Sequence, residues 1–178
     1  SSEELAKQIN EYFKKIDNEY LKSIVSVLLK KHFKDFFEFP AAVTMHHNYY
    51  SGLAYNTYSM LKLCDGFLQL YPFVNKDLVY SGVILHDLGK IIELSGPKGT
   101  EYTKKGRLLG HISLGANEIY NVSVELGYED SEEIINLLHS KGYSLKDESK
   151  NIKNLDLNLK YDEKEEIVIE DIDLSIRS

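Results

Sequence analysis

Cysteine, proline and tryptophan are scarce in this chain. Its 178 residues include one cysteine, three prolines and no tryptophan. The single cysteine, Cys64, excludes a disulfide framework and a cysteine-based zinc site. No apolar run approaches the roughly 20 residues that span a bilayer, and no signal peptide is visible. We therefore expect a cytoplasmic protein that has no membrane partner.

Basic residues are also fewer than acidic residues. The chain has 21 Lys and Arg against 28 Asp and Glu, a formal charge of −7. An acidic chain has no general attraction for nucleic acid, so any RNA contact needs a local basic patch or a separate binding domain. Walker, Rossmann and G-x-S-x-G motifs are missing, which disfavours the chemistries that depend on them.

The hydrophobic content is high enough for a folded domain. Hydrophobic residues make up 43% of the sequence, which is typical of a globular protein with one real core. The periodicity of residues 3–38 predicts a pair of amphipathic helices, and further helices are expected over 53–71 and 131–139, the last capped by Ser131. The expected fold class is mainly α.

The most informative stretch is an apolar run that ends directly in His86 and Asp87. We expect this run, which starts near Val79, to form a buried helix with Asn75 or Asp77 as its N-cap and Gly89 as its end. His86 and Asp87 would then lie in the last turn of that helix.

Adjacent imidazole and carboxylate groups have a known chemistry. They can bind one metal ion, or bind one ion and bridge to a second. Lys90 follows His86 by four residues, so a continuing helical turn would place a cation beside them. For an isolated His-Asp pair, however, a helix-end histidine beside an exposed Asp87 is the simpler interpretation.

Several other polar residues are candidates for contact with substrate. His46 and His47 could contact phosphate or order a site, and could equally cap a helix. The Gly/Pro loop over 93–100 follows the His-Asp pair and could act as a lid. The basic residues near it form a phosphate-facing rim or a solvated loop; they are Lys98, Lys104, Lys105 and Arg107.

The C-terminal part has a different character. Apolar and polar residues alternate over 154–177, which predicts a β-hairpin. A lone hairpin is marginal in water, so it must pack on the helices or pair with another chain. We divide the chain into N-terminal helices packing on the core (1–40), a helical core (41–140) and a divergent C-terminal segment (141–178).

Several separated motifs, in the same order and spacing, resemble the HD superfamily of metal-dependent phosphohydrolases. Within it they are most similar to the HD domain of YhaM-type bacterial exoribonucleases, which trim RNA from its 3′ end. The resemblance covers about residues 10–139 and implies a helical bundle. The motifs are His46-His47, Ser51-Gly52-Leu53-Ala54, Leu85-His86-Asp87-Leu88-Gly89-Lys90, Glu93-Leu94-Ser95-Gly96 and Leu109-Gly110-His111-Ile112-Ser113.

The resemblance also implies roles for particular residues. His86 and Asp87 would be metal ligands, with Asp87 able to bridge two ions, and His111 would bind the second ion. The cofactor would be one or two divalent ions, manganese first among them. Lys90 would offset charge in the transition state of phosphodiester hydrolysis.

Three departures from the family pattern bear on activity. Asn56 stands where the family has its leading ligand histidine, and an amide oxygen is a poorer transition-metal ligand than imidazole. Lys141-Gly142-Tyr143 replaces a His-His-Gly segment, and Asp171 or Asp173 could stand in for a later aspartate. The family usually has an RNA-binding OB domain in front, whereas this sequence opens on the first expected helix.

These observations leave three functional hypotheses. The first is an exoribonuclease-like HD phosphohydrolase whose activity on single-stranded RNA is weakened or lost. The alternative is a non-catalytic HD module that dimerises or binds a protein partner through the C-terminal hairpin. The third is an HD hydrolase that cleaves a small nucleotide phosphoester instead.

Overall fold

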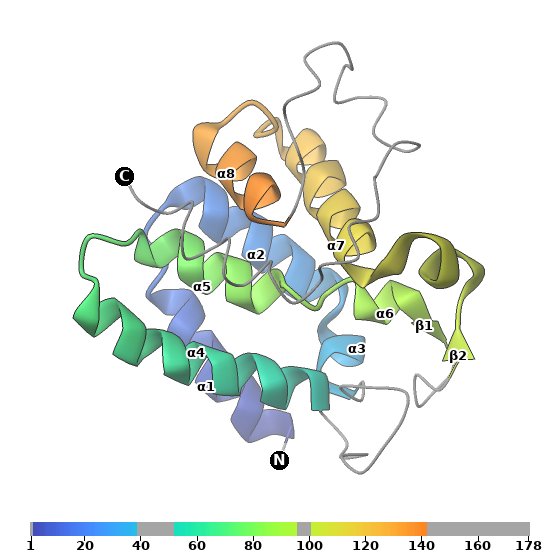
Figure 1. Cartoon of the computed structure of the whole chain (residues 1–178), viewed down its shortest axis with the longest axis horizontal. Helices are drawn as coiled ribbons and strands as arrows, with labels where there is room; N and C mark the ends of the chain where they lie inside the picture. Colours follow the sequence, from blue (N-terminus) through green and yellow to red (C-terminus); the bar gives the residue numbers. More distant parts are fainter. Residues whose placement is uncertain (1, 39–51, 96–100, 142–178) are drawn as a thin grey trace.

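The computed structural model describes residues 2–38, 52–95 and 101–141, and this part of the chain is mainly helical (Figure 1). The mainly α prediction is therefore confirmed, while the predicted hairpin over 154–177 lies outside the described residues. The helices are α1 (Ser2–Lys14), α2 (Glu19–Lys31), α3 (Phe33–Glu38), α4 (Gly52–Leu70), α5 (Lys76–Leu85), α6 (Lys90–Glu93), α7 (Lys104–Leu126) and α8 (Glu132–Ser140), and the strands are β1 (Leu94–Ser95) and β2 (Glu101–Tyr102).

Side-chain caps start several of these helices. The side chains of Asn18, Asn75, Thr103 and Ser131 each accept a hydrogen bond from the backbone N–H three residues on. Such caps satisfy donors that have no partner within the helix. The structure thus selects Asn75 as the cap of α5, while Asp77 accepts a hydrogen bond from the backbone N–H of Asn18 (2.8 Å).

The N-terminal segment holds three helices where the sequence predicts two. His32 ends α2 with non-helical backbone angles (φ −112°, ψ 18°), and α3 follows at once. Phe36 and Phe37 of α3 are buried, so this extra helix contributes to the core. The break therefore turns the chain and brings two further aromatic side chains inward.

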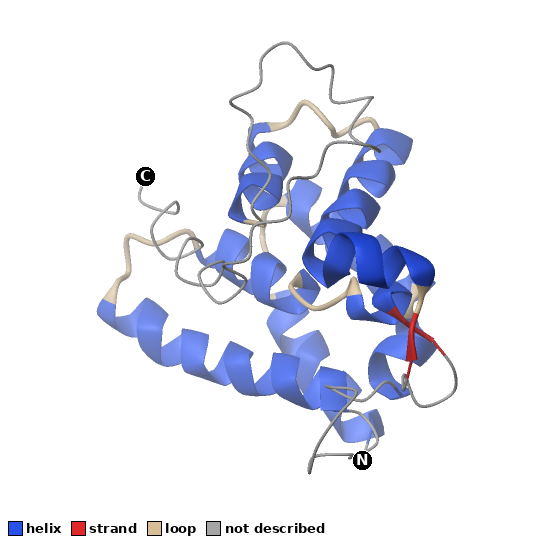
Figure 2. Cartoon of the chain, turned by 45° about the vertical axis from the view of Figure 1, so that its right-hand side comes forward, coloured by secondary structure: helices blue, strands red, loops and turns tan. Residues whose placement is uncertain are grey.

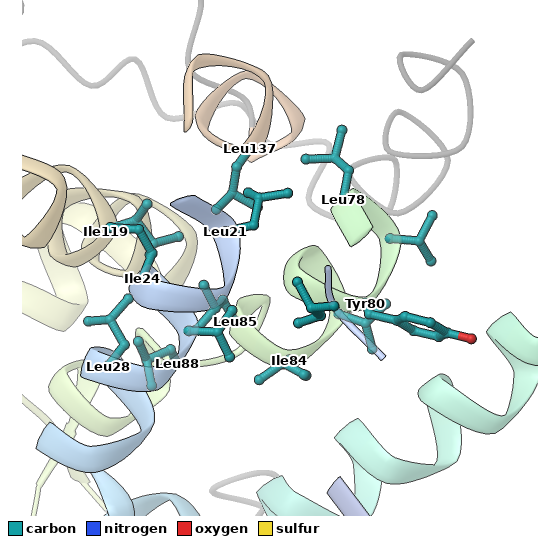
Figure 3. Close-up of a cluster of buried hydrophobic side chains, with 14 of the residues drawn as sticks. Leu21, Ile24, Leu28, Leu78, Tyr80, Ile84, Leu85, Leu88, Ile119 and Leu137 are labelled. Carbon is teal, nitrogen blue, oxygen red and sulfur yellow. The ribbon is translucent and has the colours of Figure 1, made fainter. Parts of the chain in front are cut away.

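Helix α5 lies inside the bundle and contacts α1, α2, α4 and α8 (Figure 1). Figure 2 shows that the described chain is built almost wholly of helices, with the two short strands at one edge. Every residue from Leu78 to Leu85 is buried, as expected for a helix that is apolar all round. Figure 3 shows its Ile84 and Leu85 among leucine and isoleucine side chains of α2, α7 and α8. This packing fixes the position of the turn that follows.

That turn requires a correction to the predicted helix end. Helix α5 ends at Leu85, so His86 and Asp87 lie in the turn between α5 and α6, beyond the last helical turn. Bonds that span three residues close it, from Leu88 N to Leu85 O (3.2 Å) and from Lys90 N to Asp87 O (3.0 Å). The chain tightens into a 3₁₀-like turn here, and the glycine that was expected to end α5 instead precedes α6.

Two close approaches set the path after the turn. A side chain at Gly89 would collide with the backbone of His111, so glycine lets the turn lie directly against α7. Helix α7 itself contains a break at Gly110 (φ 72°, ψ 163°), a conformation that favours glycine. His111 therefore starts the second half of α7. The whole helix begins at Lys104, earlier in the chain than predicted.

Strand β1 pairs with β2 in antiparallel register, Leu94 opposite Tyr102 and Ser95 opposite Glu101. The central residues of the expected lid, 96–100, lie outside the described part of the chain. Within the described ranges, no helix combines the length and the apolar character needed to cross a membrane.

Candidate metal centre

The Asp87 carboxylate lies at the centre of a cluster of polar side chains. It is buried, with 5% of its surface exposed. Its Oδ2 lies 3.1 Å from His86 Nε2 and 3.0 Å from Lys90 Nζ. Its Oδ1 lies 3.5 Å from His111 Nε2. The fold therefore brings together the His-Asp pair, the predicted lysine and the more distant histidine.

Both histidines are held from behind. His86 Nδ1 lies 2.6 Å from the carbonyl oxygen of Val83, and His111 Nδ1 lies 3.2 Å from Glu93 Oε2. A carbonyl or carboxylate oxygen can only accept, so we assign the ring N–H to Nδ1 in each case. Each Nε2 then faces Asp87: a protonated imidazole donates to the carboxylate from there, and a neutral imidazole presents a lone pair. A neutral imidazole and the carboxylate can hold a metal ion between them, and metal-ligating histidines are typically oriented in this manner.

Asp87 is poised to act as an anion. Burial alone would raise the pKa of its carboxyl group. The hydrogen bond and charge interaction with His86, together with the Lys90 ammonium, outweigh burial and hold the pKa well below its usual range. Asp87 is therefore a carboxylate at neutral pH, which is the protonation state that a metal ion requires of its ligand.

Asn56 of α4 lies beside Asp87. Its Nδ2 donates a long hydrogen bond of 3.4 Å to Asp87 Oδ2. In this orientation the amide group is a donor to the carboxylate. Coordination of a metal ion would need its oxygen instead, which is a weaker ligand for transition metals than imidazole.

Two further residues belong to this cluster, and no sequence pattern assigned either of them a role in it. Glu93 is buried and orients His111, whereas the sequence shows it only in a loop and in one of the motifs similar to the family. Lys141 is 3% exposed, and its Nζ donates to the carbonyl oxygens of Leu85 (2.8 Å) and His86 (2.9 Å). Burial lowers the pKa of Lys141 to about 8, although the Asp87 charge acts in the opposite direction.

Two of the residues proposed for substrate contact lie on helix α7. Lys104 and Arg107 are exposed in the first turn of α7, on the far side of the Gly110 break from His111. His46 and His47 lie outside the described residues, so their assignment stays a prediction.

The next question is whether these side chains could serve as ligands of a metal ion. In the described part of the chain, no three His, Cys, Asp or Glu side chains form a ready-made set of ligands. Two imidazole Nε2 atoms and one carboxylate nevertheless face one another, from His86, His111 and Asp87, and this donor combination suits a first-row transition metal. The residues therefore fit one ion, provided that Asp87 exchanges some of its direct contacts for it.

Comparison with known proteins identifies the family of the chain. The model of the HD domain matches residues 53–176, which is more than half of the chain. This chain belongs to the HD domain family. Proteins of this family generally depend on divalent metal ions. The family resemblance drawn from the His-Asp motif and its neighbours is confirmed.

Relatives of known function narrow the comparison. The chain is 48% identical over 139 residues to the 3′-5′ exoribonuclease YhaM of Listeria welshimeri, covering 78% of this chain and 44% of that protein. It is 47% identical over 137 residues to the protein of the same name from a Geobacillus species, covering 77% and 42%. The chain thus spans less than half the length of these relatives. No solved structure matches it.

Proposed function

We propose that this chain is an HD-type phosphodiesterase that shortens single-stranded RNA from its 3′ end with a divalent ion, manganese first among the candidates. One observation carries the proposal. Two imidazoles, each held at Nδ1, direct Nε2 at the two oxygens of a buried carboxylate. Asn56 in place of an imidazole reduces the affinity for the ion, and with it the activity.

The roles follow from the contacts of each residue. His86, Asp87 and His111 would hold the ion, which supplies Lewis acidity toward a phosphoryl oxygen and lowers the pKa of a water molecule. Lys90 keeps its Nζ 3.0 Å from Asp87 Oδ2 and places positive charge beside the site. There it can offset the negative charge that grows on a phosphoryl group during hydrolysis.

RNA as the substrate rests on the relatives, which are named as 3′-5′ exoribonucleases. The exposed side chains at the start of α7 add a local basic surface to an otherwise acidic chain. They are Lys104, Lys105 and Arg107, with Tyr102 just before them, and such a mixture of cations and an aromatic ring suits a single strand.

A cleavage assay tests the proposal. Single-stranded RNA labelled at its 5′ end is incubated with the chain and Mn²⁺, with and without a chelator. We expect slow, stepwise shortening that the chelator stops. Asn56→His should raise the rate at least about tenfold, because imidazole is the better ligand.

Asn121→His is the matched control, since it adds a histidine at an exposed position of α7. It should leave the rate unchanged. If neither the parent chain nor Asn56→His shortens RNA with any divalent ion, the proposal is wrong, and a non-catalytic binding module becomes the better hypothesis.

A further inference from the structure

A buried ammonium group lies directly behind the turn that carries His86 and Asp87. Lys141 follows the last residue of α8, and its Nζ donates to the backbone carbonyls of Leu85 and His86. A Cβ atom added to Gly115 would lie 3.5 Å from this Nζ. The charge therefore sits between the turn and the second half of α7, the two segments that supply the facing histidines.

A charge in this position carries a large desolvation cost, and such charges are normally paired. Among the described residues, no carboxylate lies within ion-pair distance of Lys141. The carboxylate whose charge acts on it is that of Asp87. Leu85 and His86 belong to the C-terminal end of α5, where carbonyl oxygens favour a cation. Lys141 thus interacts with the charge of Asp87 at a distance and stabilises the turn by hydrogen bonds.

Among the described residues, and with neutral histidines, the charges around the site balance without any metal ion. Asp87 and Glu93 are the anions of the cluster, and Lys90 and Lys141 are its cations. One divalent ion can be added if Lys90 moves away from Asp87 toward an anionic substrate.

We propose that Lys141 is a built-in cation behind this site, which holds the turn in place and lowers the affinity of the site for its divalent ion. The inference rests on the proposed function, because it concerns the same metal centre. Lys141 is a positioning residue: it holds the turn by its hydrogen bonds, and its charge opposes that of the incoming ion.

Manganese binding tests this without any activity assay. Free Mn²⁺ is followed by electron paramagnetic resonance during a titration of the parent chain, Lys141→Met and Lys141→Gln. Methionine is an unbranched side chain one atom shorter than lysine, and it removes the charge and the donors. Glutamine is also shorter, and it removes the charge but keeps an N–H donor group. Circular dichroism melts verify that each variant is folded.

We expect the parent chain to bind one ion. Both variants should bind the first Mn²⁺ at least about tenfold more tightly, because a nearby like charge is gone. Lys7→Met, which removes an exposed lysine of α1, is the control and should change neither affinity nor stoichiometry. Unchanged affinity in both folded variants would overturn the inference.

The outcome also separates this inference from the proposed function. If the parent chain binds no Mn²⁺ but Lys141→Gln binds one ion, the ammonium takes the place of the metal ion itself. That result supports Lys141 as the built-in cation and contradicts a metal-dependent activity of the parent chain. If the parent chain and both variants all fail to bind, both ideas are wrong.

Discussion

Two aspartates in this bundle look alike in the sequence but have different surroundings. Asp65 in α4 accepts hydrogen bonds from the hydroxyls of Tyr12 and Tyr80, each at 2.7 Å, and its Oδ1 lies 3.6 Å from Lys15 Nζ. Burial would raise the pKa of Asp65, but these donors outweigh it and lower the pKa. Every oxygen of Asp65 is met by a donor, and the result is a structural link between α1, α4 and α5.

Asp87 differs from Asp65 because two histidine rings, and not only donors, lie beside its carboxylate. Lys90 donates to it, but His86 and His111 face it with Nε2 while their Nδ1 atoms are held by acceptors. A carboxylate surrounded by donors needs nothing more. A carboxylate that faces two imidazole Nε2 atoms needs either a proton on the ring or a metal ion between the groups, so the comparison distinguishes a structural carboxylate from a candidate metal ligand.

The largest expected difference between the two is in metal affinity. Asp87→Asn should weaken Mn²⁺ binding by at least about 100-fold, because an anionic ligand is replaced by a neutral amide. Asp65→Asn should change the affinity by less than about twofold, since Asp65 takes no part in the site. Isothermal titration with Mn²⁺ measures both variants, and equal losses in the two would remove the distinction.

Stability should show the reverse order. Asp65→Asn is expected to lower the free energy of unfolding by about 2–3 kcal/mol, because it disturbs two hydrogen bonds to a charged group. The corresponding fall in Tm is about 5–10 °C for a chain of this size. Glu3→Gln is the control, because its exposed contact with Lys7 (3.7 Å) contributes little. A Tm for Asp65→Asn within 2 °C of the parent chain would contradict this account.

A smaller loss of Mn²⁺ affinity is expected when Glu93, which orients His111, is changed. Glu93→Gln should weaken Mn²⁺ binding about 10-fold, since residues that orient a ligand typically affect affinity by about 10–100-fold. Its amide oxygen can still accept from His111 Nδ1, which favours the lower end. The matched control is Glu125→Gln on the exposed side of α7. Equal affinity in the two variants would show that Glu93 does not orient His111.

The smallest effect is a dependence on pH. Because the pKa of Asp65 is lower in the folded chain than its unfolded value of about 3.9, Asp65 stabilises the fold above that pH. The contribution disappears as the pH falls through the folded pKa. Urea unfolding of the parent chain and Asp65→Asn should therefore show a constant gap from about pH 5 to 7 that narrows below about pH 4. A gap that widens in acid would have the wrong sign.

The sequence predicts the parts of this fold that depend on local pattern. The apolar run before His86, the cap at Ser131 and the helix of α4 are all visible as periodicity and capping residues. The HD family is recognised from several short motifs in a fixed order, and each motif is a local feature of the sequence. The family comparison confirms it.

The rest depends on contacts between distant segments. Glycine at 89 has its role only because the backbone of His111 lies against it, and the break at Gly110 is needed to bring that histidine in. Lys141 reads as an ordinary surface lysine until α8 packs beside α5 and α7. No periodicity reveals such contacts, because residues far apart in sequence create them.

The most direct test of the account is pulsed electron paramagnetic resonance of the chain with one equivalent of Mn²⁺ and ¹⁵N-labelled histidine. The account predicts couplings from two imidazole nitrogens, one of which disappears in His86→Ala and the other in His111→Ala. Couplings to water alone, or nitrogen couplings that persist in both variants, would contradict the assignment of His86, Asp87 and His111 as the metal centre.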